Sequence, residues 1–288
     1  MTRPPSARRR TVAGFAAVAA MAVAAGGCEF ESARDEQPPE SPAETSGEAP
    51  GQGAEDPDSR IAPIAPLSIE RVELGDGSKI DYVAVLPKSY TREKTYPIVV
   101  ALPPGDQSAA LAENVAASLY LREARERGWI VLSPIAPRGR LFFDGVQKRI
   151  PQLLFALADR YQPEGDKYHL VGLSNGGISA FRLAIDQPGL FHSLLAFPGF
   201  PREAGDLARL GRLREIPIRM IAGQHDVGWV EPMRDADRRL RRLGADVTLQ
   251  VEPGEEHILG TVDGRRIFDI LEPLRPPPES GEEPVVAS

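Results

Sequence analysis

Short apolar stretches alternate along this chain with longer stretches in which apolar residues recur every three or four positions. Ile69–Val72 and Lys79–Leu86 have the pattern of strands, and Gly75, Asp76 and Gly77 between them predict a hairpin turn. Further strands are predicted at Tyr96–Leu102, Trp129–Ile135, His169–Leu173, Leu194–Phe197, Ile218–Ala222 and Val247–Val251. Helical spacing predicts helices at Ala109–Arg127, Pro151–Tyr161, Asn175–Asp186, Glu231–Leu243 and Arg265–Glu272.

This order of elements predicts an α/β fold. Strands that alternate with helices form a mostly parallel sheet with helices on both faces, and the N-terminal hairpin would be its antiparallel edge. The longest connection that could hold a cap is Gly199–Pro217, with one short helical run at Asp206–Leu213. An independent domain needs roughly 50 residues or more, so we expect no large cap and an open site.

The two ends of the chain differ in composition from this body. Basic residues between Arg3 and Arg10 precede an uncharged stretch, Thr11–Ala25. Together the two segments have the layout of a secretory signal. Residues 29–60 are rich in Pro, Gly, Ser, Glu and Asp, and such a segment cannot bury enough apolar surface to fold. We therefore predict a signal peptide at 1–27, an acidic disordered tether at 28–60, a folded domain at 61–275 and a disordered tail at 276–288.

The only cysteine, Cys28, lies at the end of the predicted signal. Ala25, Gly26 and Gly27 before it resemble the lipobox of bacterial lipoproteins, in which the cysteine is lipidated and becomes the first mature residue. The resemblance implies an exported protein that a lipid anchor holds in the bacterial cell envelope. Ordinary cleavage nearby is the alternative, which would leave a secreted soluble protein with an incidental thiol.

Net charge argues against a nucleic-acid partner. The whole chain has a formal charge of -7, whereas residues 29–60 alone carry -8 and residues 1–28 carry +4. The folded body from residue 61 is therefore close to neutral, at about -3. Such a body has no basic field that could neutralise several phosphates. The chain also has no cysteine cluster, closely spaced histidines or Walker-type loop, so no metal or organic cofactor is implied.

One motif points to nucleophilic catalysis. Residues 169–177 read HLVGLSNGG, which contains the pattern GxSxG between a predicted strand and a predicted helix. A sharp turn in that context projects a serine hydroxyl at the carboxyl edge of the sheet. The pattern predicts Ser174 as a nucleophile, although Gly172 and Gly176 would also suit a purely structural turn.

A serine nucleophile needs a base to remove its proton. Three of the four histidines have other settings: His169 lies in a predicted strand, His192 precedes a buried run and His225 adjoins an aspartate. His257 alone follows the last strand in a polar loop, so it is the candidate base.

The base in turn needs an orienting acid, which follows the serine and precedes the histidine along chains of this kind. Asp226 meets this order, shortly after the strand Ile218–Ala222. Glu255 and Glu256 are alternative acids, but they lie beside the histidine in sequence and more plausibly solvate the loop.

Four blocks of the sequence are distinctive: GLSNGG at 172–177, AFPGFP at 196–201, AGQHDVGWVEP at 222–232 and EPGEEHILG at 252–260. They resemble the phospholipase/carboxylesterase family of α/β-hydrolases and, more distantly, dienelactone hydrolases and feruloyl esterases. The resemblance covers about 96–274. It implies an α/β-hydrolase fold in which Ser174 is the nucleophile, Asp226 the orienting acid and His257 the general base.

The chain departs from that family after the third predicted strand, where the family usually has LHG and this chain has LPPGD. This loop should supply one donor of the oxyanion hole, and the backbone N–H of Asn175 the other. Pro103 and Pro104 have no N–H, so Gly105 or Asp106 must serve. Either the prolines only stiffen an equivalent loop, or the hole is impaired.

The leading hypothesis is a serine hydrolase that cleaves carboxylic esters or thioesters of small molecules through an acyl-enzyme. A serine peptidase with the same triad and a binding lipoprotein that has lost activity remain alternatives. Several aromatic residues follow strand ends and are candidates for an apolar acyl pocket, although residues so placed often pack the core: Phe142, Phe143, Phe197, Phe200 and Trp229.

Overall fold

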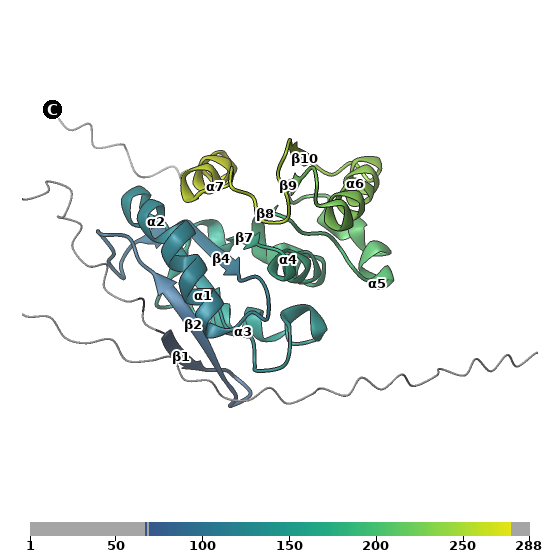
Figure 1. Cartoon of the computed structure of the whole chain (residues 1–288). Coiled ribbons are helices and arrows are strands. Elements are labelled where there is room, and N and C mark those ends of the chain that lie inside the picture. Colours follow the sequence, from purple (N-terminus) through teal and green to yellow (C-terminus); the bar gives the residue numbers. More distant parts are fainter. Residues whose placement is uncertain (1–66, 68, 278–288) are drawn as a thin grey trace, which may run out of the picture. The chain divides into compact units, whose positions relative to one another are not determined.

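The computed structural model describes residue 67 and residues 69–277 (Figure 1). The predicted signal peptide, the predicted tether with Cys28, and residues 278–288 of the predicted tail lie outside the described residues. The strands are β1 Ile69–Glu73, β2 Lys79–Val85, β3 Thr95–Tyr96, β4 Ile98–Leu102, β5 Ile130–Pro134, β6 Gln162–Pro163, β7 Tyr168–Gly172, β8 Phe191–Ala196, β9 Ile218–Gly223 and β10 Val247–Glu252. The α-helices are α1 Ala109–Val115, α2 Leu121–Arg127, α3 Arg149–Leu157, α4 Asn175–Asp186, α5 Ala204–Leu207, α6 Val227–Arg242 and α7 Gly264–Leu271.

An eight-stranded sheet runs through the described part in the order β1-β2-β5-β4-β7-β8-β9-β10. From β5 to β10 every neighbouring pair is parallel. β2 pairs antiparallel with both β1 and β5. The predicted α/β architecture with an antiparallel N-terminal hairpin is therefore confirmed.

The sheet is buried on both faces. In β4, Ile98, Val100 and Leu102 belong to one apolar cluster, and Val99 and Ala101 belong to another. The first cluster includes side chains of α3, α4 and α6, and the second includes side chains of α1, α2 and α7. Because successive strand residues point to opposite faces, a strand between two helical layers is apolar throughout, as β4 is.

Helix α3 starts two residues before its predicted start and ends at Leu157, four residues before its predicted end. Two further helices also differ from the pattern in the sequence. The helix expected at 109–127 contains a π-helical segment, Ala116–Tyr120, between α1 and α2, and ends as predicted at Gly128 with φ +82°. Helix α6 begins at Val227, four residues before the predicted start. Gly228 is a poor helix former and lies before the predicted start, whereas the fold begins the helix directly after Asp226.

The connection between β8 and β9 carries no separate cap. It holds only α5 and a 3-10 turn at Leu210–Leu213. Arg182 of α4 donates to the buried Asp206 of α5 at 2.6 Å, which ties this connection to the side of the sheet domain. The carboxyl edge of the sheet is thus not covered by an inserted domain in the part of the chain that the structure describes.

Candidate active site

Ser174 lies in the turn between β7 and α4, at the carboxyl edge of the sheet. Its backbone has φ +57° and ψ -120°, a conformation that costs a non-glycine residue about 1–3 kcal/mol. The two glycines of the motif permit this turn: a Cβ on Gly172 would lie 2.3 Å from the carbonyl oxygen of Gly176, and one on Gly176 would lie 2.0 Å from that of Leu102. Close approach of the helix to the strands therefore requires both glycines.

Three side chains form a continuous chain of hydrogen bonds. Ser174 Oγ lies 2.8 Å from His257 Nε2, and His257 Nδ1 lies 2.7 Å from Asp226 Oδ2. The Asp226 carboxylate accepts a hydrogen bond from Nδ1–H, so that Nε2 is the nitrogen that accepts from the serine hydroxyl. The structure therefore brings together the three residues that the sequence predicts as a triad.

The loops after β9 and β10 are joined to each other, which aligns Asp226 with His257. Gln224 N donates to Glu252 O at 2.9 Å, and His225 N donates to Glu255 O at 2.9 Å. A Cβ on Gly223 would lie 2.0 Å from the carbonyl oxygen of Glu256, so only glycine allows the loops to approach this closely.

The alternative acids have other positions. Glu255 accepts hydrogen bonds from the backbone N–H groups of Gly260 and Thr261 at 2.9 and 3.1 Å, and so holds the loop that follows His257. Glu256 is exposed. Asp226 is the carboxylate that contacts the imidazole.

The other histidines are not part of this arrangement. His169 is buried in β7 beside Ser193, with Nδ1 2.8 Å from the serine Oγ. His192 lies in β8, which begins three residues before the predicted start, and its Nε2 lies 2.9 Å from Glu164 O. His225 is exposed.

The proline-containing loop after β4 adjoins the turn that holds Ser174. The Asn175 side-chain amide donates to Gly105 O at 2.9 Å, and Leu173 N donates to Leu102 O at 3.4 Å. Gly105 has φ +59°, and a Cβ there would lie 2.7 Å from the side chain of Leu111. The backbone N–H groups of Asn175, Gly105 and Asp106 form no hydrogen bond with any residue that the structure describes, and they remain available to an oxyanion.

Gln107, which sequence reasoning missed, fixes this loop. Its side chain is fully buried and donates to Ser179 Oγ at 3.0 Å and to Pro103 O at 3.2 Å. Its Oε1 accepts from Phe142 N at 2.7 Å. Neither periodicity nor spacing distinguishes this glutamine from a surface residue, because its partners come from distant parts of the chain.

Two of the aromatic residues predicted to line an acyl pocket are instead core residues. Phe142 and Phe197 are 0% and 2% exposed, which corrects that prediction for both. Phe142 belongs to one of the two apolar clusters and Phe197 to the other. Phe143 is also buried, and the guanidinium of Arg202 lies 5.4 Å from the centre of its ring.

The other two aromatic candidates lie at the triad. The ring centre of Trp229 is 4.8 Å from that of His257 and 5.2 Å from that of Phe200. Val227 and Ile258, next in sequence to Asp226 and His257, are 65% and 86% exposed. An apolar surface therefore borders the His257 side of Ser174.

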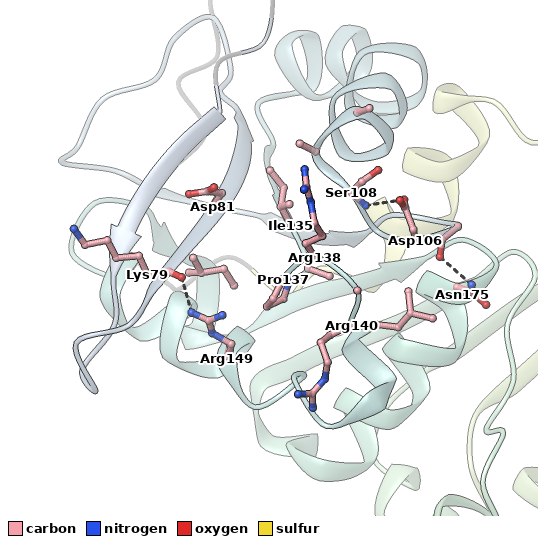
Figure 2. A pocket seen from close by; sticks show the side chains of 17 residues that line it. Lys79, Asp81, Asp106, Ser108, Ile135, Pro137, Arg138, Arg140, Arg149 and Asn175 are labelled. Atoms are coloured by element: carbon pink, nitrogen blue, oxygen red, sulfur yellow. Dashed lines mark hydrogen bonds between the residues drawn. The ribbon is translucent and has the colours of Figure 1, made fainter.

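A cavity of about 860 Å³ lies beside the loop after β4, which contributes Gly105, Asp106 and Ser108 to its lining (Figure 2). Its walls come from β2, from the loops after β4 and β5, from α3 and from Asn175. Hydrogen bonds from Ser108 lower the pKa of Asp106 in its wall, so this carboxyl is ionised at neutral pH. The site thus has an open, partly charged cavity beside it.

The described residues were also compared with the requirements of a membrane-spanning helix and of a metal site. None of their helices is long and apolar enough to cross a membrane. They also contain no group of three or more His, Cys, Asp or Glu side chains arranged to hold a metal ion.

No family model and no curated protein matches the chain. Solved structures do match it. A thermostable esterase is 22% identical with a TM-score of 0.56 over 72% of this chain and 60% of its own. The S-formylglutathione hydrolase from Agrobacterium tumefaciens is 17% identical with a TM-score of 0.57 over 72% and 93%. Porphyromonas gingivalis dipeptidyl peptidase 4 is 13% identical with a TM-score of 0.57 over 73% and 35%.

These matches establish the fold. The chain spans 60% of the length of the thermostable esterase and 35% of that of the dipeptidyl peptidase. The neighbours share the α/β-hydrolase fold, which this chain therefore has, as the motifs predicted. One fold supports many chemistries, so the reaction must be argued from the site.

Proposed function

We propose that this chain is a serine hydrolase that cleaves carboxylic esters or thioesters through an acyl-enzyme. The observation that carries the proposal is the hydrogen-bonded chain from Ser174 Oγ through His257 to Asp226 Oδ2, with the serine in a strained turn. Strain that the surrounding packing maintains is typical of a functional position, since a structural turn would relax it.

The reaction takes place in two steps. Ser174 Oγ attacks the carbonyl carbon while His257 Nε2 takes its proton, and the imidazolium then gives that proton to the departing alcohol or thiol. A water molecule attacks the acyl-enzyme with the same base, which releases the carboxylic acid and restores the serine. Asp226 stabilises the imidazolium and fixes the orientation of the ring.

The oxyanion of each tetrahedral intermediate needs hydrogen-bond donors. Asn175 N–H is one donor, and Gly105 or Asp106 N–H is the other. The bond from the Asn175 side chain to Gly105 O and the buried contacts of Gln107 hold the two donor segments together. This anchoring supports an active enzyme over a binding protein whose prolines have disabled the hole.

A fluorophosphonate probe tests the proposal directly. We expect covalent labelling of the folded wild-type protein, no labelling of Ser174→Ala, and full labelling of Ser118→Ala, which removes an exposed serine on the π-helical segment. Chromogenic esters should be hydrolysed, and Ser174→Ala should reduce kcat by at least about a thousandfold. If the folded wild-type protein were not labelled, the proposed serine hydrolase activity would be refuted.

The same assay separates an esterase from a peptidase. An ester and an amide with the same acyl group differ only in the leaving atom, so the ratio of their kcat/KM values reports the preferred bond. We expect hydrolysis of the ester to dominate. A faster reaction with the amide would favour a peptidase. This alternative is tested because dipeptidyl peptidases are among the structural neighbours.

We propose, in addition, that the hydrolase is exported and held in the cell envelope by a lipid on Cys28. Support comes from the position of the only cysteine, directly after a signal-like segment. A secreted soluble form is the alternative.

A further inference from the structure

The cavity beside the loop after β4 has an excess of positive charge. Its charged lining residues are Lys79, Asp81, Asp106, Arg138, Arg140 and Arg149. Asp81 is already neutralised, because Arg71 outside the cavity holds both of its carboxylate oxygens. Asp106 is therefore the one lining carboxylate without an arginine partner among the described residues, against four cations.

The cations have no carboxylate partners in the described part of the chain. Arg149 donates to Ser78 Oγ and to Lys79 O, and Arg140 donates to Asp144 O, all of which are neutral acceptors. Arg138 is exposed on the loop after β5 and forms no hydrogen bond or ion pair with a described residue. In Figure 2 its side chain extends between Asp81 of the hairpin and Ser108, whereas Arg140 points away from Asn175.

The sheet order places this cavity and His257 on opposite sides of the nucleophile. Ser174 follows β7, and the cavity is built from the β2, β5 and β4 side of that strand. His257 follows β10 at the other edge of the sheet. The leaving group must take its proton from His257, so it departs on the β10 side, and the acyl group extends toward the cavity.

We infer that the cavity binds an acid group on the acyl part of the substrate. The inference rests on the proposed ester hydrolysis. The preferred substrate is an ester or thioester of a dicarboxylic acid, or of another acid with a second anionic group. Arg138 binds that anion, and the apolar surface at Trp229 receives the leaving group. The cavity of about 860 Å³ accommodates an acyl chain of several carbons with its terminal carboxylate.

A matched pair of substrates tests this assignment. Mono-4-nitrophenyl adipate and 4-nitrophenyl hexanoate have the same leaving group and the same chain length, and only the first has a terminal carboxylate. The readout is the ratio of their kcat/KM values after subtraction of spontaneous hydrolysis, because a ratio cancels losses common to both. We expect the wild type to prefer the adipate about tenfold, and less so at high salt, since ions screen exposed charges.

Variants of Arg138 identify the cation. Arg138→Gln should lower the ratio about threefold, Arg138→Glu should lower it further, and Arg138→Lys should keep most of it. Arg122→Gln removes the same charge from α2, where the side chain is 82% exposed and outside the cavity, and should leave the ratio unchanged.

Each outcome has a distinct meaning. A ratio near one that does not respond to Arg138 overturns the inference, while hydrolysis of the hexanoate would still support the proposed function. Absence of both hydrolysis and fluorophosphonate labelling would refute the proposed function itself. A third substrate, the hexanoate ester of 4-hydroxybenzoate, has its charge on the leaving group. If Arg138→Gln impairs this ester more than the adipate, the anion belongs on the leaving side and the assignment is wrong.

Discussion

His169 makes a quantitative prediction for the stability of the fold. It lies in β7 and is 1% exposed, with its ring 5.0 Å from Trp129 and 5.3 Å from His192. Nδ1 contacts Ser193 Oγ, and Nε2 is buried without a hydrogen-bond partner among the described residues. Burial, with the nearby charges of His192 and Arg275, lowers the pKa of His169 to about 3.

This shift links folding to pH. The imidazole of an unfolded chain has a pKa of about 6.5, so between about pH 6.5 and pH 3 the unfolded state binds a proton that the folded state rejects. The stabilising contribution is fully present above the unfolded pKa and is lost as pH falls toward the folded pKa. The lower pKa of His169 reduces the free energy of unfolding by about 2 kcal/mol at pH 5 and by almost nothing at about pH 7.5.

The assay is urea unfolding at about pH 7.5 and about pH 5, with the same measurement on His169→Gln. Substitution lowers stability at both pH values, so the informative quantity is the difference between them. We expect the wild type to lose about 2 kcal/mol more than His169→Gln over this range. His225→Gln removes an exposed histidine and should behave as the wild type. If the free energy of unfolding depended on pH equally in the wild type and in His169→Gln, His169 would not be a buried imidazole that stays neutral in the folded state.

Four further predictions follow from the site and the chain ends. Asp226→Asn should preserve folding and lower kcat by roughly 10⁴-fold, because the amide stabilises the wrong tautomer of the base; a change below tenfold would contradict its role. Gly176→Ala places a Cβ 2.0 Å from a carbonyl oxygen and should lower the Tm sharply, whereas Gly189→Ala, with no atom within 4 Å, should not. Cys28→Ser should move the protein from the membrane fraction to the soluble fraction or leave it unprocessed, and unchanged fractionation would argue against the anchor. Activity on long-chain esters should show no jump at their solubility limit, because the connection between β8 and β9 holds only short helical turns.

The sequence could predict the sheet and the proximity of Ser174, Asp226 and His257 because both depend on local patterns. Each strand of a two-faced parallel sheet is a short apolar run, and each helix has its own 3.6-residue period. The turn that holds Ser174 is likewise a local feature, since its glycines are neighbours in sequence. Asp226 and His257 follow the ends of strands, and the carboxyl ends of parallel strands meet at one edge. Helix starts were less predictable, as α6 shows, because the helix begins at Val227 despite the poor helix propensity of Gly228.

Distant contacts set the features that sequence reasoning missed. Phe142 and Phe200 have the same chemistry and both follow strand ends, yet one is buried in the core and the other packs on Trp229 beside the triad. Gln107 acts through Ser179, which is 72 residues away in sequence. The positive cavity likewise arises only when the hairpin, the loop after β5 and α3 come together, although the folded body as a whole is close to neutral. Because β2 joins the sheet beside β5 and supplies Lys79, Ile80 and Asp81 to the cavity wall, we expect substitutions there to alter substrate choice while the arrangement of Ser174, His257 and Asp226 stays intact.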